Sequence, residues 1–218
     1  TLQRGDFAVF MGLNGSGKST LMKIIMGLYH DYEGEIYIND INLKQVNLAY
    51  YRQRIGTLFQ DYIKYENSIS ENIWYGNLKY RRDSQKLDQL LRKVELDKFA
   101  DKKEQVLGYQ FNQGRQLSIG QWQKLALART LIKEAEVYIF DEPNSALDLI
   151  SENAILQSIY AETKEKITLM IMHRFNHVVA KANKIIVLKD GYIEEIGTHE
   201  ELLENKGTYY ELYSIQNE

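Results

Sequence analysis

The sequence predicts an α/β fold whose core is a mostly parallel sheet. Three short apolar runs carry this prediction: Phe7–Met11, Val137–Phe140 and Ile167–Met172. Runs of this length are typical of strands buried on both faces, as in parallel sheets. Each run ends at a polar residue or a glycine-rich loop. Because ligands bind at the carboxyl ends of strands in open α/β sheets, we expect these three ends to converge on one site.

Local patterns predict the remaining elements. A helix is expected over Ser19–Met26, because apolar residues recur there on one side. The pair Asp190-Gly191 between two apolar runs predicts a hairpin, and the tail from His199 onward is predicted to be helical. Further strands are expected at Glu35–Ile38, Ile55–Phe59, Lys184–Leu188 and Tyr192–Ile196.

A helical segment is expected at about residues 61–134. Apolar residues at i, i+3, i+4 and i+7 mark one face of an amphipathic helix there: Leu87, Leu90, Leu91 and Val94. Two Ser-x-x-Glu/Gln patterns, Ser68–Glu71 and Ser118–Gln121, fit the capping box that begins many helices. The second of these is predicted to begin a helix that runs to about Ile132.

Composition excludes several classes of protein. Cysteine is absent, so a disulfide framework and a thiolate zinc site are excluded. The formal net charge is −3, whereas nucleic-acid binders usually show a basic excess, so no nucleic-acid partner is expected. No apolar run approaches the roughly 20 residues that span a bilayer. Any membrane crossing is therefore expected from another domain or chain.

The glycine-rich segment after the first strand satisfies the pattern G-x-x-x-x-G-K-[ST] of a phosphate-binding loop. Its backbone N–H groups and the following helix N-terminus would surround phosphate oxygens. Lys18 is expected to reach the β- and γ-phosphates of ATP, and the Ser19 hydroxyl to hold Mg²⁺. The alternative, a chance glycine turn, is disfavoured by the strand before the loop and the helix after it. The predicted ATP contacts are Gly12, Asn14, Gly15, Ser16, Gly17, Lys18, Ser19 and Thr20.

Two further motifs carry chemistry. The strand at Val137–Phe140 ends in Asp141-Glu142. In phosphate-binding-loop proteins the first acid helps to hold Mg²⁺, and the second is well placed to polarise an attacking water. An exposed acidic turn is the alternative reading of these two acids. In the other motif, Ser118 and the Gly120 amide lie at a predicted helix N-terminus that can bind an anion.

Taken together, these motifs resemble the nucleotide-binding domain of ABC (ATP-binding cassette) transporters. The family signature is Leu-Ser-Gly-Gly-Gln, and residues 117–121 read Leu-Ser-Ile-Gly-Gln. Gln60 lies in a segment similar to the Q-loop, Ser145–Asp148 resembles the D-loop, and His173 resembles the switch histidine. The resemblance runs from the first residues to the last and implies a P-loop NTPase fold. It further implies a single ATPase domain over residues 1–218, with an inserted helical subdomain at about 61–134.

The resemblance also implies a site shared by two copies packed head to tail. One copy would supply a catalytic group of Glu142, His173, Gln60 and Lys18, with Ser19, Gln60 and Asp141 holding Mg²⁺. In that group Glu142 would be the general base, and His173 would contact the γ-phosphate. The second copy would contribute Ser118, Gly120 and Gln121 to the same ATP, and Asp148 would cross the interface. Hydrolysis would power a membrane domain, fused or separate, at the cytoplasmic face of the cell membrane.

The sequence departs from the family pattern in two places. Ile119 replaces the first signature glycine and adds bulk where phosphate must approach, so the partner's half of the site is expected either to tolerate a side chain or to be weakened. The chain also begins almost at the first strand. The family's N-terminal antiparallel strands and its adenine-stacking aromatic residue are therefore expected to be missing.

Several stretches resemble exporters, among them Glu66–Ile73 and Gly197–Leu203. Exporters of bacterial peptides, including bacteriocins of the lantibiotic type, are similar at Leu107-Gly108, Phe111, Gly114 and Gln116–Lys124. Two alternatives remain open. One is a soluble ABC ATPase of DNA repair or chromosome maintenance, although the chain lacks that group's coiled coils and zinc cysteines. The other is a nucleotide-binding regulatory module that hydrolyses weakly, which Ile119 favours and Glu142 and His173 disfavour.

Overall fold

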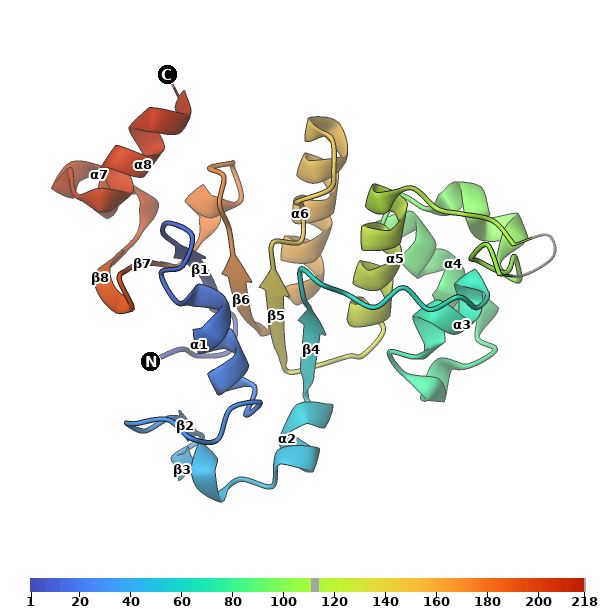
Figure 1. The fold of residues 1–218 in the computed structure, drawn as a ribbon, viewed down its shortest axis with the longest axis horizontal. Coiled ribbons are helices and arrows are strands. Elements are labelled where there is room, and N and C mark those ends of the chain that lie inside the picture. The colour runs from blue at the N-terminus through green and yellow to red at the C-terminus, as the bar shows by residue number, and fades with distance from the viewer. Residues whose placement is uncertain (111–113, 218) are drawn as a thin grey trace. The chain divides into compact units, whose positions relative to one another are not determined.

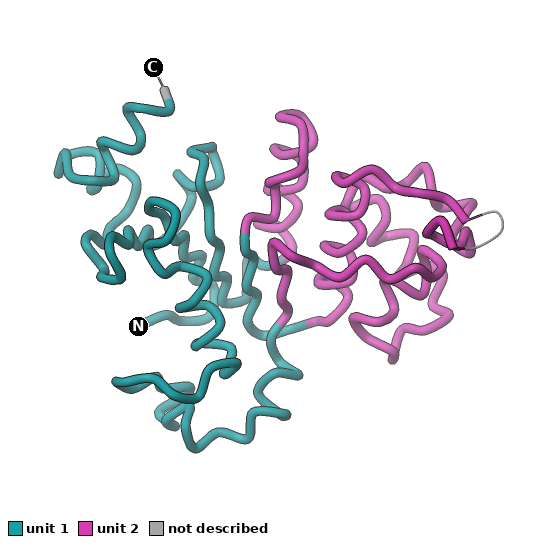
Figure 2. The backbone as a smooth tube through the Cα atoms, viewed as in Figure 1, with its two compact units in different colours: residues 1–55, 135–141, 163–218 teal, residues 56–134, 142–162 magenta. Residues whose placement is uncertain are grey.

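A computed structural model describes residues 1–110 and 114–217 of the chain. The chain forms two compact units, shown in different colours in Figure 2. The first unit comprises residues 1–55, 135–141 and 163–218, and the second comprises residues 56–134 and 142–162. The second unit thus contains the segment 61–134 that was expected to be helical, together with a later segment that was not assigned to it.

The first unit is built on a mostly parallel sheet, as the sequence predicts (Figure 1). Its strands lie in the order β5-β6-β1-β7-β8. Pairing is parallel from β5 to β7, and β8 runs antiparallel to β7 as the second arm of the predicted hairpin. The strand bounds are β1 Phe7–Met11, β5 Val137–Asp141, β6 Ile167–Ile171, β7 Lys184–Lys189 and β8 Tyr192–Gly197.

The strand register brings the predicted strand ends to one edge of this sheet. Ile171 of β6 pairs with Phe10 of β1 on one side and with Asp141 of β5 on the other. The chain therefore leaves β1, β5 and β6 at the same level. The strands are the buried core of the unit, and Val9, Met170 and Ile171 have no solvent exposure. That burial explains why these strands are continuous apolar runs rather than alternating patterns.

Helices and a small hairpin complete the first unit. The helices are α1 Lys18–Ile25, α2 Leu48–Gln53, α7 His199–Asn205 and α8 Thr208–Asn217. Helices α7 and α8 pack against each other and against β8, which confirms the predicted helical tail. The strand expected at Glu35–Ile38 is shorter, because only β2 Tyr37–Ile38 pairs, with β3 Ile41–Asn42. Neither α2 nor β3 was predicted.

The second unit is mostly helical. It contains α3 Ile69–Trp74, α4 Ser84–Lys93, α5 Ile119–Leu131 and nearly all of α6 Leu149–Thr163, and strand β4 Ile55–Leu58 leads into it. The amphipathic stripe on α4 is confirmed, because Leu87, Leu90, Leu91 and Val94 are all buried. Helix α6 was not predicted. Among the described residues, no helix is both long and apolar enough to cross a membrane.

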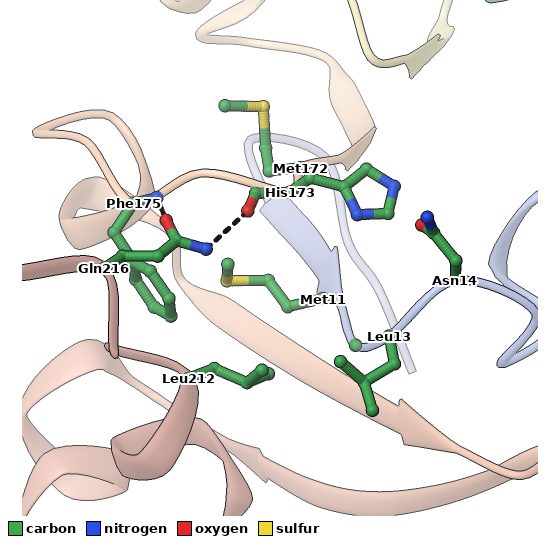
Figure 3. Close-up of a pocket in the computed structure, with 9 residues that line it drawn as sticks. Met11, Leu13, Asn14, Met172, His173, Phe175, Leu212 and Gln216 are labelled. Carbon is green, nitrogen blue, oxygen red and sulfur yellow. Dashed lines mark hydrogen bonds between the residues drawn. The ribbon is translucent and has the colours of Figure 1, made fainter. Parts of the chain in front are cut away.

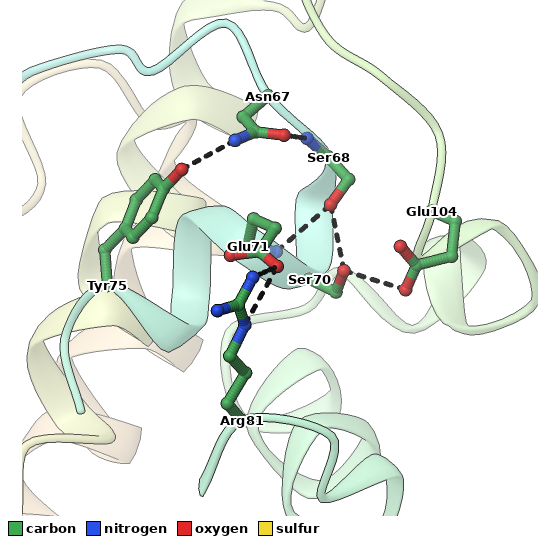
Figure 4. A network of polar contacts seen from close by, with 7 residues as sticks. All are labelled: Asn67, Ser68, Ser70, Glu71, Tyr75, Arg81 and Glu104. Carbon is green, nitrogen blue, oxygen red and sulfur yellow. Dashed lines mark hydrogen bonds and ion pairs between the residues drawn. The ribbon is translucent and has the colours of Figure 1, made fainter. Parts of the chain in front are cut away.

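The two predicted capping boxes have different outcomes. At α5, the Ser118 hydroxyl accepts from the Gln121 amide and the Gln121 side chain accepts from the Ser118 amide, both at 3.2 Å, so the box is complete. At α3, the Ser68 hydroxyl accepts from the Glu71 amide at 3.2 Å. The Glu71 carboxylate, however, pairs with Arg81 at 2.7 Å instead of returning to Ser68 (Figure 4).

A neighbouring amide takes over the second half of the cap at α3. The Ser68 amide donates to the Asn67 side-chain oxygen at 2.8 Å, and the Asn67 amide group donates to the Tyr75 hydroxyl at 2.6 Å. Ser70 extends the network to Glu104 at 2.8 Å (Figure 4). The prediction of a helix start at Ser68 was right, and the assignment of Glu71 as the reciprocal cap was wrong because an arginine offers a stronger partner.

Candidate nucleotide site

The loop from Gly12 to Thr20 joins β1 to α1 in the first unit, as predicted. Gly12 fixes its first turn, where φ is +137°. A Cβ atom at this position would lie 2.1 Å from the Leu188 carbonyl oxygen of β7, far inside van der Waals contact. Only glycine permits both this φ and this approach. The loop is therefore held close to the sheet before it turns into α1.

Lys18 lies inside this loop. Its side chain is buried, and its ammonium group donates to the carbonyl oxygens of Gly12 and Leu13, each at 2.9 Å, and to the Ser16 hydroxyl at 3.2 Å. Lys18 is also the first residue of α1, and no side chain within the described part of the chain caps that helix. The loop thus combines a fixed positive charge with backbone N–H groups at a helix N-terminus, which together favour an anion.

Asp141 provides the acidic component in the same unit. The carboxylate is buried at the end of β5, and its Oδ1 atom has no hydrogen-bond partner among the residues that the structure describes. A buried carboxylate oxygen without a partner is costly unless a cation or a donor satisfies it. Mg²⁺ prefers such oxygen ligands. Asp141 and the half-buried Ser19 hydroxyl are thus a donor set that fits Mg²⁺.

His173 follows β6 and lies close to the start of the phosphate-binding loop. Both line a cavity of about 460 Å³. In Figure 3 the His173 imidazole extends toward the side chain of Asn14, which belongs to the loop. The cavity is lined by Met11, Gly12, Leu13, Asn14, Met172, His173, Phe175, Leu212 and Gln216. The first unit therefore brings together three of the predicted features: the loop, Asp141 and His173.

The second unit brings Gln60 and Glu142 together. The Gln60 side-chain amide donates to a Glu142 carboxylate oxygen at 3.4 Å, a long contact. Glu142 has φ +51°, a left-handed conformation that is uncommon for residues other than glycine. Such conformations persist where the surroundings hold them, and they are concentrated at functional sites.

Gln123 holds the backbone around Glu142, and sequence reasoning missed this role. Its side-chain amide donates to the Glu142 carbonyl oxygen at 3.1 Å and to the Ser145 hydroxyl at 3.2 Å. Its carbonyl oxygen accepts from the Ala146 amide at 3.1 Å. The glutamine was visible in the sequence, but its partners lie about twenty residues away, so no local pattern indicated them. One buried side chain thus fixes the whole segment from Glu142 to Ala146.

The N-terminus of α5 packs against that segment. A Cβ atom at Gly120 would lie 2.9 Å from the Ala146 carbonyl oxygen, so glycine allows the close approach. Ile119 begins the helix with an ordinary helical backbone, and its side chain is 64% exposed. Within this unit Ile119 therefore causes no strain. Its carbonyl oxygen accepts from the Tyr62 hydroxyl at 3.1 Å.

Asp148 has a local role in the structure. Its carboxylate accepts from the Ile150 amide at 3.1 Å and from the Ser151 amide at 3.0 Å, which caps α6. The hydrogen bonds from the Ser151 backbone and hydroxyl lower the pKa of Asp148 below its ordinary value. Asp148 is solvent-exposed, as are Leu149 and Ile150 after it. The predicted interface residue is thus available at the surface of its unit.

Comparisons with known proteins agree with these features. A profile of the family described as ABC transporter matches residues 1–145. The chain is 42% identical over 222 residues to the subtilin transport ATP-binding protein SpaT of Bacillus subtilis, covering 100% of the chain and 36% of that protein. It is 41% identical over 217 residues to the nisin transport ATP-binding protein NisT of Lactococcus lactis subsp. lactis, covering 98% of the chain and 36% of that protein.

A solved structure is also similar. A bacterial Atm1-family ABC exporter with ATP bound matches with a TM-score of 0.89 and 29% identity, over 100% of the chain and 38% of the exporter chain. The chain thus spans little more than a third of the length of the relatives that it matches.

Proposed function

The chain belongs to the ABC transporter family, and we propose that it is the part of an exporter that binds Mg·ATP and hydrolyses it to drive transport. The observation that carries this proposal is the loop from Gly12 to Thr20, with the Lys18 ammonium inside it and the helix α1 after it. Phosphoryl transfer to water needs positioning and charge neutralisation more than covalent chemistry. The loop supplies both for the phosphate groups.

Each side chain around the phosphates has a proposed task. Lys18 and the loop amides bind the β- and γ-phosphates. Ser19, Asp141 and Gln60 hold Mg²⁺, which when bound neutralises charge on the phosphate oxygens. Glu142 accepts the proton of the attacking water, and its contact with Gln60 supports a shared role in orienting that water. His173 donates a hydrogen bond to the γ-phosphate, a task supported by its place on the same cavity as Asn14.

A second copy of the chain completes the site in this proposal. The α5 N-terminus, with Ser118, Gly120 and Gln121, contributes to the ATP held by the other copy, since a helix N-terminus attracts anions. Asp148 reaches across the interface, which its solvent exposure permits. Closing a site between two copies excludes water and strengthens the electrostatic interactions inside it. ATP then stabilises the closed pair, and its hydrolysis allows the pair to separate.

The transported cargo is proposed to be a bacterial peptide of the lantibiotic type. This rests on the similarity to the transport proteins named for subtilin and nisin. A membrane domain, fused or separate, would carry the peptide and would hold the ATPase at the cytoplasmic face of the membrane. A peptide substrate binds in that membrane domain, so cargo is tested with the full transporter. A cell that expresses it should release the peptide, and should lose that release when Glu142 is changed.

The experiment that tests the ATPase compares Mg·ATP turnover of the chain with that of Glu142→Gln. Loss of a general base should lower turnover by about 100-fold or more. Oligomeric state is measured in the same samples, and the variant should accumulate as an ATP-bound dimer. Glu204→Gln, the same chemical change at an exposed position, should behave as the unmodified chain. Equal turnover in Glu142→Gln and the unmodified chain would refute the assignment of the base. A chain without turnover that binds ATP as a monomer would favour a regulatory module.

A further inference from the structure

The loop that carries His173 leaves the sheet after Met172. The Met172 amide donates to the Phe10 carbonyl oxygen at 3.1 Å, and His173 and Arg174 then bend away from β6. Downstream, the Asn176 side chain accepts from the Val178 amide at 3.0 Å and starts the next turn. The two peptide groups on either side of Arg174 have partners from another element.

Gln216 of α8 supplies those partners. Its side-chain amide group donates to the His173 carbonyl oxygen at 2.7 Å, and its side-chain oxygen accepts from the Phe175 amide at 3.0 Å (Figure 3). A carboxamide offers a donor and an acceptor in one planar group. One side chain thus binds the backbone on both sides of Arg174 and fixes the relative orientation of the two peptide groups.

Helix α8 is itself firmly placed. Phe175 stands edge-on to Tyr209 and Tyr213 of α8, with ring centroids 5.1 and 5.2 Å apart. Tyr209 is fully buried, and its hydroxyl is 2.7 Å from His199 Nδ1, a hydrogen bond to α7. Its amide donates to Glu195 of β8 at 2.7 Å. Because α7 and β8 anchor α8, Gln216 approaches the His173 loop from a fixed support.

From these contacts we infer that Gln216 is a positioning residue for His173. It fixes the backbone from which the imidazole projects, and so it holds the ring toward the phosphate-binding loop across the shared cavity. The inference rests on the proposed role of His173 at the γ-phosphate. The hydrogen bonds of Gln216 go to the backbone of the His173 loop and not to the phosphate-binding loop. Loss of its carboxamide leaves ATP bound by the loop and lowers the fraction of bound ATP that meets a correctly directed imidazole.

The test compares Gln216→Ala and Gln216→Glu with the control Ile215→Ala. Ile215 is a neighbouring α8 residue with a side chain 73% exposed. Gln216 is also exposed, so its removal leaves no cavity. We expect Gln216→Ala to lower kcat about tenfold and to change KM by less than about twofold, as the loss of two neutral hydrogen bonds predicts. Gln216→Glu keeps the acceptor for the Phe175 amide but places a carboxylate oxygen against the His173 carbonyl oxygen, so it should lower kcat at least as much as Gln216→Ala does.

Amide hydrogen exchange provides a readout that does not need turnover. The Phe175 amide should exchange about tenfold faster in Gln216→Ala than in Ile215→Ala, because its acceptor is gone. In a His173→Ala background, Gln216→Ala should cause no further loss of kcat, since the two changes act through one group.

The outcomes separate this inference from the proposed function. If His173→Ala retains full turnover, the proposed role of His173 fails. If His173→Ala loses turnover while Gln216→Ala retains it, the inference about Gln216 fails and the proposed function stands. Unchanged exchange at Phe175 in Gln216→Ala would likewise overturn the inference, even for a chain without turnover. Equal losses in Gln216→Ala and Ile215→Ala would assign the effect to α8 as a whole rather than to the carboxamide.

Discussion

Gln123 supports the backbone from Glu142 to Ala146, and its removal should lower the stability of the second unit by a measurable amount. The change is Gln123→Ala. The side chain is 2% exposed, and its amide makes three hydrogen bonds to Glu142, Ser145 and Ala146. A neutral hydrogen bond contributes about 1 kcal/mol net, and truncation also leaves polar groups unpaired beside a small void. Together these effects should lower the free energy of unfolding of the second unit by about 3 kcal/mol.

Tryptophan fluorescence reports the unfolding of the second unit. The chain has two tryptophans, Trp74 and Trp122. Both lie in the second unit and are buried, at 7% and 2% exposed. In urea, with a slope of about 2 kcal/mol/M, a loss of 3 kcal/mol moves the emission midpoint down by about 1.5 M. Gln116→Ala, an exposed glutamine in the same unit, should leave the midpoint within about 0.3 M.

The result that would refute this reasoning is a Gln123→Ala midpoint equal to that of the Gln116→Ala control. Gln123→Glu retains an acceptor for the Ala146 amide but loses the donor to Glu142 and buries a charge, so its midpoint should lie at or below that of Gln123→Ala. A Gln123→Glu midpoint equal to that of the Gln116→Ala control would show that the donor half of the carboxamide does not contribute. Turnover should fall in Gln123→Ala even at low temperature where the unit is folded, since the Glu142 backbone loses its support.

Three further predictions concern a glycine, a buried charge and a titration. Gly12→Ala should lose ATP binding and about 3 kcal/mol of stability, because its Cβ would lie 2.1 Å from the Leu188 carbonyl oxygen; an unshifted melting temperature would contradict this. Arg129→Met should lower the free energy of unfolding by about 3 kcal/mol, which is measured as a lower urea midpoint of tryptophan emission. The guanidinium is buried, which lowers its pKa, and its removal leaves three oxygen acceptors without a charged donor. An NMR titration should find the pKa of Asp148 below its ordinary value because of the hydrogen bonds from Ser151. The ionised Asp148 carboxylate then stabilises the folded chain fully above its ordinary pKa, and this contribution is lost as pH falls through the lowered pKa. An ordinary pKa would refute that cap.

Much of the sheet could be predicted because burial on both faces leaves a direct trace in the sequence. Phe7–Met11 and Ile167–Ile171 are apolar at every position but Thr168. The loop after Phe7–Met11 has a glycine and lysine spacing that is typical of phosphate-binding loops. Helix α6 could not be predicted in the same way. Its buried face runs through Ile155, Leu156 and Ile159 but also includes Glu152, which is 4% exposed and accepts from Asn144 at 2.8 Å. A carboxylate in an otherwise apolar stripe hides the helical period.

The supporting residues of the candidate site were beyond sequence reasoning for another reason. The motif residues Lys18, Asp141 and His173 have spacings and neighbours that point to phosphate chemistry. Gln123 and Gln216 are ordinary glutamines on helices, and only the folded backbone shows which carbonyl and amide groups they meet. A side chain that binds distant backbone groups leaves no periodic signal, because its partners can be any residue type.

The position of the Lys18 ammonium has a consequence for how nucleotide enters. Within the loop, backbone carbonyl oxygens already coordinate this charge at 2.9 Å, so it is solvated by the protein rather than by water. Arriving phosphates therefore replace one set of oxygen ligands with another instead of stripping a hydration shell from a bare ion. The loop therefore receives the phosphates around a positive charge that the protein already holds in place.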